Sequence, residues 1–247
     1  MELSHFFQSC GPCALAFSGG VDSAYLLYAA LQAGADVQPY YVKTAFQPAF
    51  ELDDARRLAR ELGAELKLVE VDILAVPGVA ENPADRCYAC KTALLTAIKA
   101  AAEGDGRSLL LDGTNASDRV DDRPGMRALR ELGVRSPLRE AGLTKDSIRR
   151  LSREAGLFTW DKPAYACLAT RIPAGTAITA EQLERVEAGE EALKQLGYRD
   201  FRIRLYHGAA RLQLPEDELE RAVRERKELR RVLQPWFETI LLDLEGR

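Results

Sequence analysis

Short runs of apolar residues alternate with helical patterns along the first two thirds of the chain. Four such runs predict buried strands, at residues 14–17, 37–42, 65–71 and 108–112. Apolar positions that recur every three or four residues predict helices among them, at 21–32, 51–62, 86–102 and 144–155. Strands that alternate with helices form βαβ units, so the pattern predicts a parallel sheet with helices on both faces.

The pattern changes near residue 175, where a smaller domain is expected to begin. The remaining predicted elements are a helix at 179–196, strands at 201–205 and 209–214, a charged helix at 215–232 and a last apolar strand at 237–242. We therefore expect an α/β fold with a parallel-sheet domain over residues 1–174 and a small α+β domain over residues 175–247. Residues 112–143 and 161–175 are rich in Gly, Pro and charged residues, which predicts long functional loops.

Composition narrows the classes of protein that fit. The chain has 247 residues and a formal net charge of −4. Binding duplex DNA through its phosphates needs a basic surface, so a nucleic-acid partner is not expected. No apolar run reaches the roughly 20 residues of a membrane helix, and the first residues lack a signal-peptide pattern, so a cytoplasmic protein is expected. The five cysteines then indicate thiol or metal chemistry rather than a disulfide framework.

The most informative motif is the glycine loop Ser18-Gly-Gly-Val-Asp-Ser23, between the first predicted strand and the first predicted helix. Its two glycines let backbone N–H groups approach a ligand, and the helix N-terminus attracts anions. Asp22 would repel a phosphate, so binding Mg²⁺ or capping the helix suits it better. No Lys follows the glycines, which excludes a Walker A loop. A simple helix-capping turn is the alternative, but the carboxyl end of the first strand favours a ligand site.

The cysteines form two C-x-x-C pairs and one single position. Cys10 and Cys13 precede the first strand, at the sheet edge opposite the glycine loop, so a structural role is expected for them. Cys87 and Cys90 lie in the first turn of a predicted helix, whose dipole stabilises thiolates. Cys167 lies in the second long loop between cations. Three thiolates could bind an iron–sulfur cluster with one open iron, or zinc with a missing fourth ligand, and an inert buried thiol is the alternative for Cys167.

The glycine loop resembles the PP-loop of the ATP pyrophosphatases, which holds the pyrophosphate of ATP while a substrate oxygen attacks the α-phosphorus. Motifs at residues 112–118, 121–129, 136–138, 162–163 and 166–173 are similar to those of the LarE family. These proteins are ATP-dependent sulfur transferases that make the nickel-pincer nucleotide of lactate racemase. The ATP-binding residues that the resemblance implies are Ser18, Gly19, Gly20, Val21, Asp22, Ser23 and Gly113.

The resemblance also implies a mechanism with ATP and Mg²⁺. A carboxylate of pyridinium-3,5-biscarboxylic acid mononucleotide is adenylated, and sulfur at Cys167 then displaces AMP to give a thiocarboxylate. In one branch of the family the cysteine at this position gives up its own sulfur. The branch with a C-x-x-C binds a four-iron four-sulfur cluster, and Cys87, Cys90 and Cys167 match its ligands. The resemblance makes these three cysteines and Asp22 the catalytic residues. It also implies a homo-oligomer, and a sulfur donor or downstream proteins of cofactor synthesis as partners.

The substrate of that family carries a phosphate, which needs cations. Arg202 and Arg204 alternate on one predicted strand and so point to the same face, where they could grip a phosphate, with Glu190 to orient them. A solvated sheet face is the alternative for these arginines. For the whole chain, two alternatives stay open: a PP-loop enzyme that thiolates tRNA, and a nucleotide-binding or zinc protein without catalysis.

Overall fold

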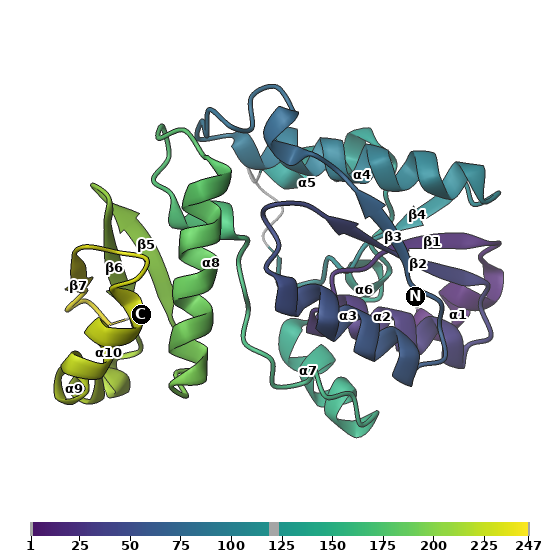
Figure 1. Cartoon of the computed structure of the whole chain (residues 1–247). Coiled ribbons are helices and arrows are strands. Elements are labelled where there is room, and N and C mark those ends of the chain that lie inside the picture. The colour runs from purple at the N-terminus through teal and green to yellow at the C-terminus, as the bar shows by residue number, and fades with distance from the viewer. Residues whose placement is uncertain (1, 119–123, 247) are drawn as a thin grey trace. The chain divides into compact units, whose positions relative to one another are not determined.

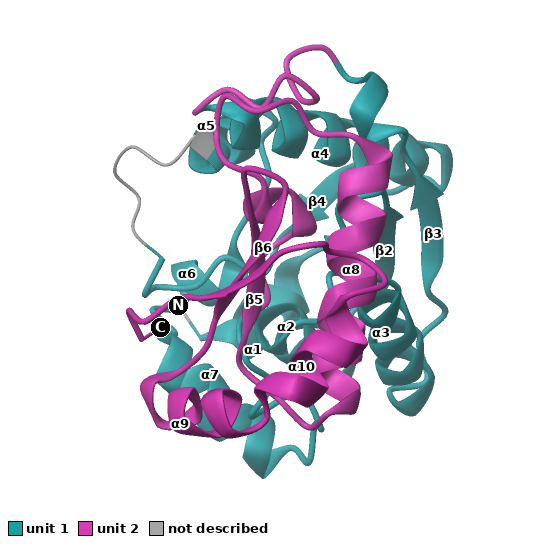
Figure 2. Cartoon of the chain, turned by 60° about the vertical axis from the view of Figure 1, so that its left-hand side comes forward, with its two compact units in different colours: residues 1–76, 85–164 teal, residues 77–84, 165–247 magenta. Residues whose placement is uncertain are grey.

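The computed structural model describes residues 2–118 and 124–246, which form two compact units. Unit 1 comprises Met1–Val76 and Asp85–Ala164, and unit 2 comprises Pro77–Ala84 and Tyr165–Arg247 (Figure 2). Unit 2 thus includes a short segment inserted from the first half of the chain. The domain division predicted after residue 174 stays a prediction.

A parallel sheet forms the centre of unit 1, with its strands in the order β3-β2-β1-β4 (Figure 1). The strands are β1 (Cys13–Ala16), β2 (Val37–Lys43), β3 (Lys67–Glu70) and β4 (Leu109–Leu111). The helices α2 (Val21–Gln32), α3 (Ala49–Glu61) and α4 (Arg86–Gly104) connect successive strands. The predicted α/β fold with a parallel sheet is therefore confirmed.

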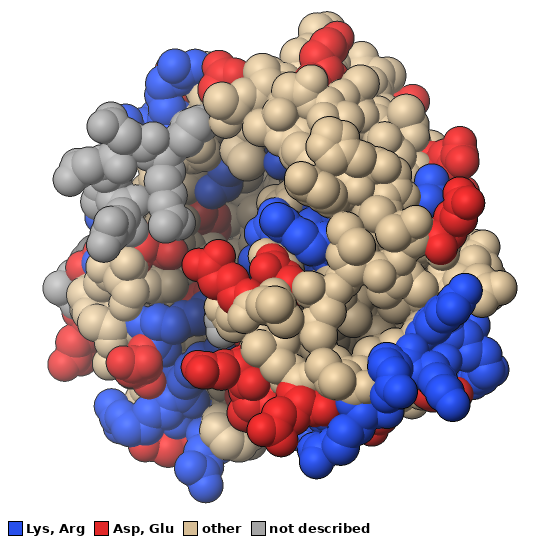
Figure 3. Space-filling model, turned by 90° about the vertical axis from the view of Figure 1, so that its left-hand side faces the viewer, with Lys and Arg blue, Asp and Glu red and all other residues tan. Residues whose placement is uncertain are grey.

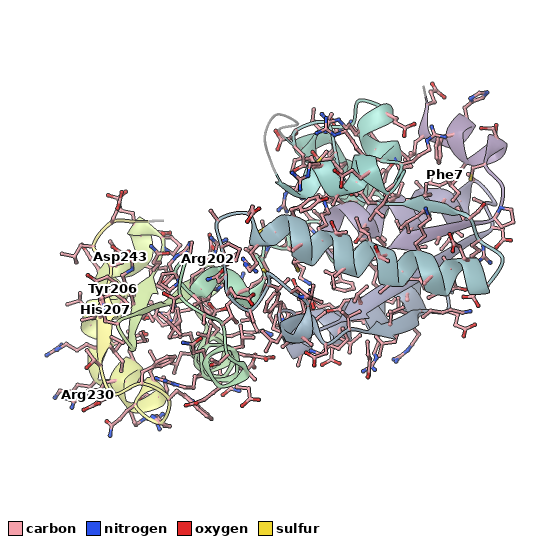
Figure 4. The ribbon with its side chains drawn as sticks, turned by 90° about the horizontal axis from the view of Figure 1, so that it is seen from above. Phe7, Arg202, Tyr206, His207, Arg230 and Asp243 are labelled. Atoms are coloured by element: carbon pink, nitrogen blue, oxygen red, sulfur yellow. The ribbon has the colours of Figure 1, made fainter. Side chains whose placement is uncertain are left out.

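Helices cover both faces of this sheet. Alternate residues of a strand point to opposite sides, so neighbouring residues of β1 pack against different helices. Leu15 packs with α2 and with Phe7 of the additional helix α1 (Leu3–Ser9), which is labelled in Figure 4. Ala14, the neighbour of Leu15, packs on the other face with Leu95 and Ile98 of α4. The central strand β1 is apolar on both sides for this reason.

The expected loop at residues 112–143 is wrong in part. This stretch contains the helices α5 (Pro124–Glu131) and α6 (Pro137–Glu140). Elsewhere in unit 1, a 3₁₀ turn forms at Ile73–Ala75. Ala128 and Leu129 are buried, so α5 has an apolar side that its Gly and Pro residues concealed in the sequence. Residues 119–123, with the beginning of the motif at 121–129, lie outside the described residues.

Unit 2 is a small α+β unit, as predicted. A 3₁₀ turn at Leu168–Arg171 is followed by α8 (Ala180–Gln195), β5 (Arg202–Tyr206), β6 (Ala209–Gln213), α9 (Glu216–Arg224), α10 (Arg226–Leu233) and β7 (Ile240–Leu242). The sheet has the order β5-β6-β7, with β5 antiparallel and β7 parallel to β6. The single charged helix expected at 215–232 is two helices, because the backbone leaves helical geometry at Glu225.

The segment Pro77–Ala84 is held within unit 2 by one buried amide. The side chain of Asn82 donates hydrogen bonds to the carbonyl groups of Pro173 (2.9 Å) and Thr176 (3.1 Å). The Asn82 carbonyl in turn accepts from the Gly175 N–H at 2.8 Å. These bonds pair the segment with the loop that follows the Leu168–Arg171 turn.

Two surface properties bear on partners. None of the helices in residues 2–118 and 124–246 is long and apolar enough to cross a membrane. On the face in Figure 3, Lys and Arg side chains are mixed with Asp and Glu over much of the surface, with the largest basic group at one lower edge.

Candidate active site

The glycine loop follows β1 directly and leads into α2. Gly19 has a φ of +70°, and a Cβ there would lie 3.0 Å from the Ala55 Cα of α3, so a larger residue does not fit. The buried Ser23 hydroxyl donates to the Gly20 carbonyl at 3.2 Å and lies 3.2 Å from the Ser18 hydroxyl. Gly20 is the N-cap of α2, so no side chain covers the first N–H groups of that helix. They remain available to an anion.

A second loop, which follows β4, approaches the glycine loop closely. A Cβ on Gly113 would lie 3.0 Å from the Ser23 backbone nitrogen, so glycine is needed for this approach. The neighbouring Asp112 is buried and accepts hydrogen bonds from the hydroxyls of Ser136 (2.6 Å) and Thr114 (2.5 Å). These bonds fix the loop that the sequence motif at 112–118 identified.

A cavity of about 350 Å³ opens between these loops at the carboxyl ends of β1, β2 and β4. Its polar lining includes Ser18, Asp22, Ser23, Lys91, Asp112 and Asp118. Leu94 and Ile98 of α4 line an apolar part, and Tyr41 closes the side of β2. The Tyr41 hydroxyl is buried and has no hydrogen-bond partner in the described part of the chain, so a ligand could supply one. A cavity of this size and position is typical of a small-molecule site.

The Asp22 carboxylate is paired within unit 1. Lys145 Nζ lies 2.5 Å from its Oδ2, and the Asn115 side-chain amide donates to its Oδ1 at 3.3 Å. Lys145 begins α7 (Lys145–Glu154), which Thr144 caps by accepting the Ser147 N–H. Sequence reasoning missed both partners of Asp22. Asn115 lies inside the motif at 112–118, but nothing near Lys145 in sequence indicates its contact.

The carboxylates suit a magnesium ion that arrives with a phosphate ligand. Asp22, Asp112 and Asp118 line the cavity, and Mg²⁺ prefers oxygen ligands. Among residues 2–118 and 124–246, however, no group of three or more His, Cys, Asp or Glu could hold a metal ion alone. The donor set therefore fits Mg²⁺ held by one or two carboxylates and by the phosphates of its ligand.

Cys87 and Cys90 lie at the start of α4. Lys91, which follows Cys90, lines the cavity. The Cys87 side chain is exposed, Cys90 is half-buried, and neither forms a disulfide. The Arg86 guanidinium donates to the Cys87 sulfur at 4.0 Å. A metal site formed by these two cysteines and Cys167 stays a prediction.

Cys167 lies in unit 2, directly before the Leu168–Arg171 turn. Its carbonyl accepts hydrogen bonds from the Thr170 N–H (3.0 Å) and hydroxyl (2.9 Å). Arg171, whose side chain is 0% exposed, donates to the Ala166 carbonyl at 2.9 Å. The backbone on both sides of the half-buried Cys167 is therefore fixed.

Glu190 of α8 anchors this loop. Its carboxylate accepts two hydrogen bonds from Arg171, at 2.8 and 3.1 Å, and a further one from the Tyr165 hydroxyl. The Ile203 N–H of β5 donates to the same carboxylate at 3.0 Å. Glu190 thus joins α8, β5 and the loop that carries Cys167. The sequence analysis did not predict that Arg171 pairs with Glu190, because tertiary packing brings the two residues together.

Arg202, which is labelled in Figure 4, and Arg204 lie on one face of β5, as the alternation predicted. Arg204 donates to the Gln213 side chain at 2.6 Å and to the Thr170 carbonyl at 2.7 Å. Arg202 pairs with Gln213 of β6 through the backbone, but its side chain has no hydrogen-bond or ion-pair partner in the described residues. Burial lowers the pKa of both guanidinium groups, and neighbouring arginines lower it further. A bound anion would compensate these charges.

Cys10 and Cys13 lie at the other end of β1 from the glycine loop. Cys13 is fully buried, and burial, with the nearby Cys10, raises the pKa of its thiol to about 12. A thiol with this pKa stays protonated at neutral pH. Neither cysteine lines the cavity, and the structural role expected for the pair stays a prediction.

No protein-family model matches this chain. Known proteins are similar to it over more than half or nearly all of its length. An uncharacterized protein of Synechocystis is 38% identical over 253 aligned positions, which span 99% of this chain and 93% of that protein. A pyridinium-3,5-bisthiocarboxylic acid mononucleotide synthase of Lactiplantibacillus plantarum is 34% identical over 235 positions, or 94% of this chain and 85% of the synthase. A subunit of the glutamine-hydrolyzing GMP synthase of Methanosphaerula palustris is 30% identical over 155 positions, or 58% of this chain and 50% of that protein.

Proposed function

Since the chain belongs to the LarE-like family of PP-loop ATP pyrophosphatases, which are ATP-dependent enzymes, we propose that it is an ATP-dependent sulfur transferase. One observation carries the proposal: the PP-loop and the Gly113 loop meet at a cavity at the carboxyl ends of β1 and β4. Substrate activation by ATP needs such a site, with N–H groups of a helix terminus and cations directed at phosphates.

In the first step, a substrate carboxylate attacks the α-phosphorus of ATP, and pyrophosphate leaves. The residues Ser18, Gly19, Gly20, Val21, Asp22, Ser23 and Gly113 surround the pyrophosphate in this proposal. Lys91 and Lys145 offset its charge, while Asp22 and Asp112 provide carboxylate oxygens for Mg²⁺. Mg²⁺ there would neutralise charge that develops on the leaving pyrophosphate.

The proposed substrate is pyridinium-3,5-biscarboxylic acid mononucleotide, because the Lactiplantibacillus relative is a synthase of the corresponding bisthiocarboxylic acid. Its phosphate would bind Arg202 and Arg204, whose desolvated guanidinium groups favour an anion. Glu190 serves this site as a positioning residue, since its contact with the Ile203 N–H holds the strand between the two arginines.

In the second step, a sulfur nucleophile attacks the acyl adenylate and AMP leaves. In the cluster route the nucleophile would be sulfide from the sulfur donor, with Cys167 as a cluster ligand, and a thiocarboxylate forms directly. In the cysteine-sacrificing route the Cys167 thiolate forms a thioester, and loss of the Cys167 Cα proton then breaks its Cβ–Sγ bond, which leaves dehydroalanine and the thiocarboxylate. Cys87, Cys90 and Cys167 are the proposed ligands of a four-iron four-sulfur cluster. Such a cluster would supply an iron with an open coordination position, which sulfur delivery needs. A homo-oligomer and a separate sulfur donor are part of the same proposal.

Pyrophosphate release in the presence of ATP and the dicarboxylate mononucleotide tests the first step. We expect release that depends on the mononucleotide and is lost in Asp22→Ala and in Ser23→Ala. Release by both variants at the wild-type rate would contradict the ATP site. Release with a tRNA but not with the mononucleotide would favour the tRNA-thiolating alternative.

Iron and acid-labile sulfide content after anaerobic reconstitution tests the cluster. Wild-type protein that holds both, with their loss in Cys87→Ala, would support the three-cysteine ligand set. Wild-type protein without iron that loses one sulfur from Cys167 during turnover would favour the cysteine-sacrificing route. Cys13→Ala is the matched control, because this cysteine lies outside the proposed ligands, and its iron content should equal that of the wild type.

A further inference from the structure

Cys10 and Cys13 form a second thiol pair that the proposed function does not use. Cys10 follows α1 as its C-cap with an extended backbone (φ −87°, ψ 139°), and the chain bends at Pro12 before β1 begins. Cys10 packs against the apolar cluster that contains Cys13, and the two side chains are close enough to interact. Two thiols in contact can form a disulfide with little backbone movement.

The two thiols differ in access. Cys10 is half-buried, so a small molecule can reach it, while Cys13 is 0% exposed and packs in the core of unit 1. An asymmetric pair of this kind suits disulfide exchange, in which an accessible cysteine reacts first and a protected one resolves the intermediate.

Charged groups beside the pair suit the same chemistry. The Arg135 guanidinium is close enough to interact with negative charge on Cys10. It is held in place by Glu140, which accepts from its Nε at 3.1 Å, and by the Phe6 ring, whose centroid lies 4.6 Å away. At the other cysteine, Arg107 donates to the Cys13 carbonyl at 3.4 Å. Each cysteine of the pair therefore has a guanidinium group beside it.

We propose that Cys10 and Cys13 are a thiol–disulfide exchange site for small disulfides such as glutathione disulfide. The Cys10 thiolate attacks one sulfur of the disulfide, forms a mixed disulfide and releases one thiolate. Cys13 then loses its proton and attacks the Cys10 sulfur, which closes the intramolecular bond and releases the second thiolate. In total, two cysteine thiols are oxidised and one small disulfide is reduced to two thiols. This chemistry does not depend on sulfur transfer at Cys167.

The wild-type chain allows a direct test, because trypsin cleaves first after Lys43. The peptide of residues 1–43 contains Cys10 and Cys13 alone, and the peptide of residues 87–91 contains the other C-x-x-C pair as an internal control. Folded protein is equilibrated with mixtures of reduced and oxidised glutathione, acid-quenched, labelled with a maleimide and digested. As the oxidised fraction of glutathione rises, we expect both maleimide labels to disappear from peptide 1–43 together. The unlabelled peptide should be lighter by two hydrogens than its reduced form. If both labels stay at every ratio, or if either cysteine joins a different peptide, the proposal is wrong.

Two single variants test the order of attack. Cys13→Ser should accumulate glutathione on Cys10, because the mixed disulfide can no longer be resolved. Cys10→Ser should remain unmodified, because Cys13 is buried. Equal rates of glutathione addition to folded Cys13→Ser and folded Cys10→Ser would contradict the assignment of Cys10 as the attacking thiol.

Discussion

Lys145 Nζ lies 2.5 Å from the Asp22 carboxylate, so an ion pair joins two residues that are 123 positions apart in sequence. It connects the start of α7 to the first turn of α2, beside the PP-loop. The pair explains how an acidic residue can line a site for a polyanion, because the ammonium group offsets the carboxylate. If Mg²⁺ binds Asp22, we expect the released ammonium group to contact phosphate oxygens.

Lys145→Ala should therefore lower kcat/KM for ATP by roughly 10²-fold, the usual effect of removing one donor to a developing charge. The loss has two causes, since the phosphates lose a cation and Asp22 loses its partner. Pyrophosphate release is the measurement, and Lys145→Arg should recover part of it. Arg150→Ala, in an exposed pair on the same helix, is the control and should retain wild-type activity. Equal activity of Lys145→Ala and the control would show that Lys145 does not contribute to the ATP site.

Gly113→Ala should impair ATP binding because its methyl group would lie 3.0 Å from the Ser23 nitrogen and 3.3 Å from the Ser23 Cα. The backbone of the PP-loop would have to move, at a cost of about 1–3 kcal/mol. We expect KM for ATP to rise. Gly104→Ala is the matched control, because nothing lies within 4 Å of its added methyl group. This control should raise stability by about 0.5–1 kcal/mol and leave KM unchanged.

The sequence predicted those helices and strands in which buried residues recur at one regular spacing. The bounds of α2 agree in full with the predicted helix at 21–32, and the strand with Arg202 and Arg204 was predicted from alternation. The helix α5 was missed because Pro124 and Gly125 are typical of a loop. Its buried side forms only when the helix packs on α4.

The candidate site was predictable only where one segment carries the chemistry. The PP-loop and the C-x-x-C at Cys87 are contiguous motifs, so sequence alone indicated them. Lys145 and Arg171 gain their roles from Asp22 and Glu190, which are distant in sequence. No local pattern specifies such a pair, because tertiary packing brings its members together.

Breaking the Arg171–Glu190 pair should destabilise unit 2. The Arg171 side chain is 0% exposed and that of Glu190 5%, and removing one partner leaves a buried charge, which costs about 3–5 kcal/mol. Urea unfolding of Glu190→Gln should show this loss, and replacing both residues by apolar ones should restore part of it. Arg231→Ala removes an exposed pair with Glu228 and should cost far less, because solvent screens the two charges. A cost for Glu190→Gln as small as that of Arg231→Ala would mean that the pair is not an anchor.

The Asp243 carboxylate should make unit 2 less stable in acid. A hydrogen bond from Gln213, at 2.9 Å, and Arg211, whose Nε lies 3.5 Å away, hold the pKa of Asp243 below 3.8. Because the folded pKa is depressed, the stabilisation is complete above the unfolded pKa and is lost as pH falls through the folded pKa. The difference in unfolding free energy between wild type and Asp243→Asn should be constant near neutral pH and shrink below pH 3.8. A difference that is independent of pH would show that the ionised carboxylate contributes nothing.

Cys167→Ala should separate the two proposed steps of the reaction. The Cys167 loop is held through Thr170 and Arg171 and not through the thiol, so loss of the sulfur should leave the loop intact. The ATP cavity is lined by residues of unit 1 alone, so pyrophosphate release should continue at close to the wild-type rate. Mass spectrometry should find no thiocarboxylate from this variant, while Cys13→Ala under reducing conditions should form it normally. Continued thiocarboxylate formation by Cys167→Ala would refute sulfur delivery at Cys167, whereas loss of both activities would show that Cys167 also supports adenylation.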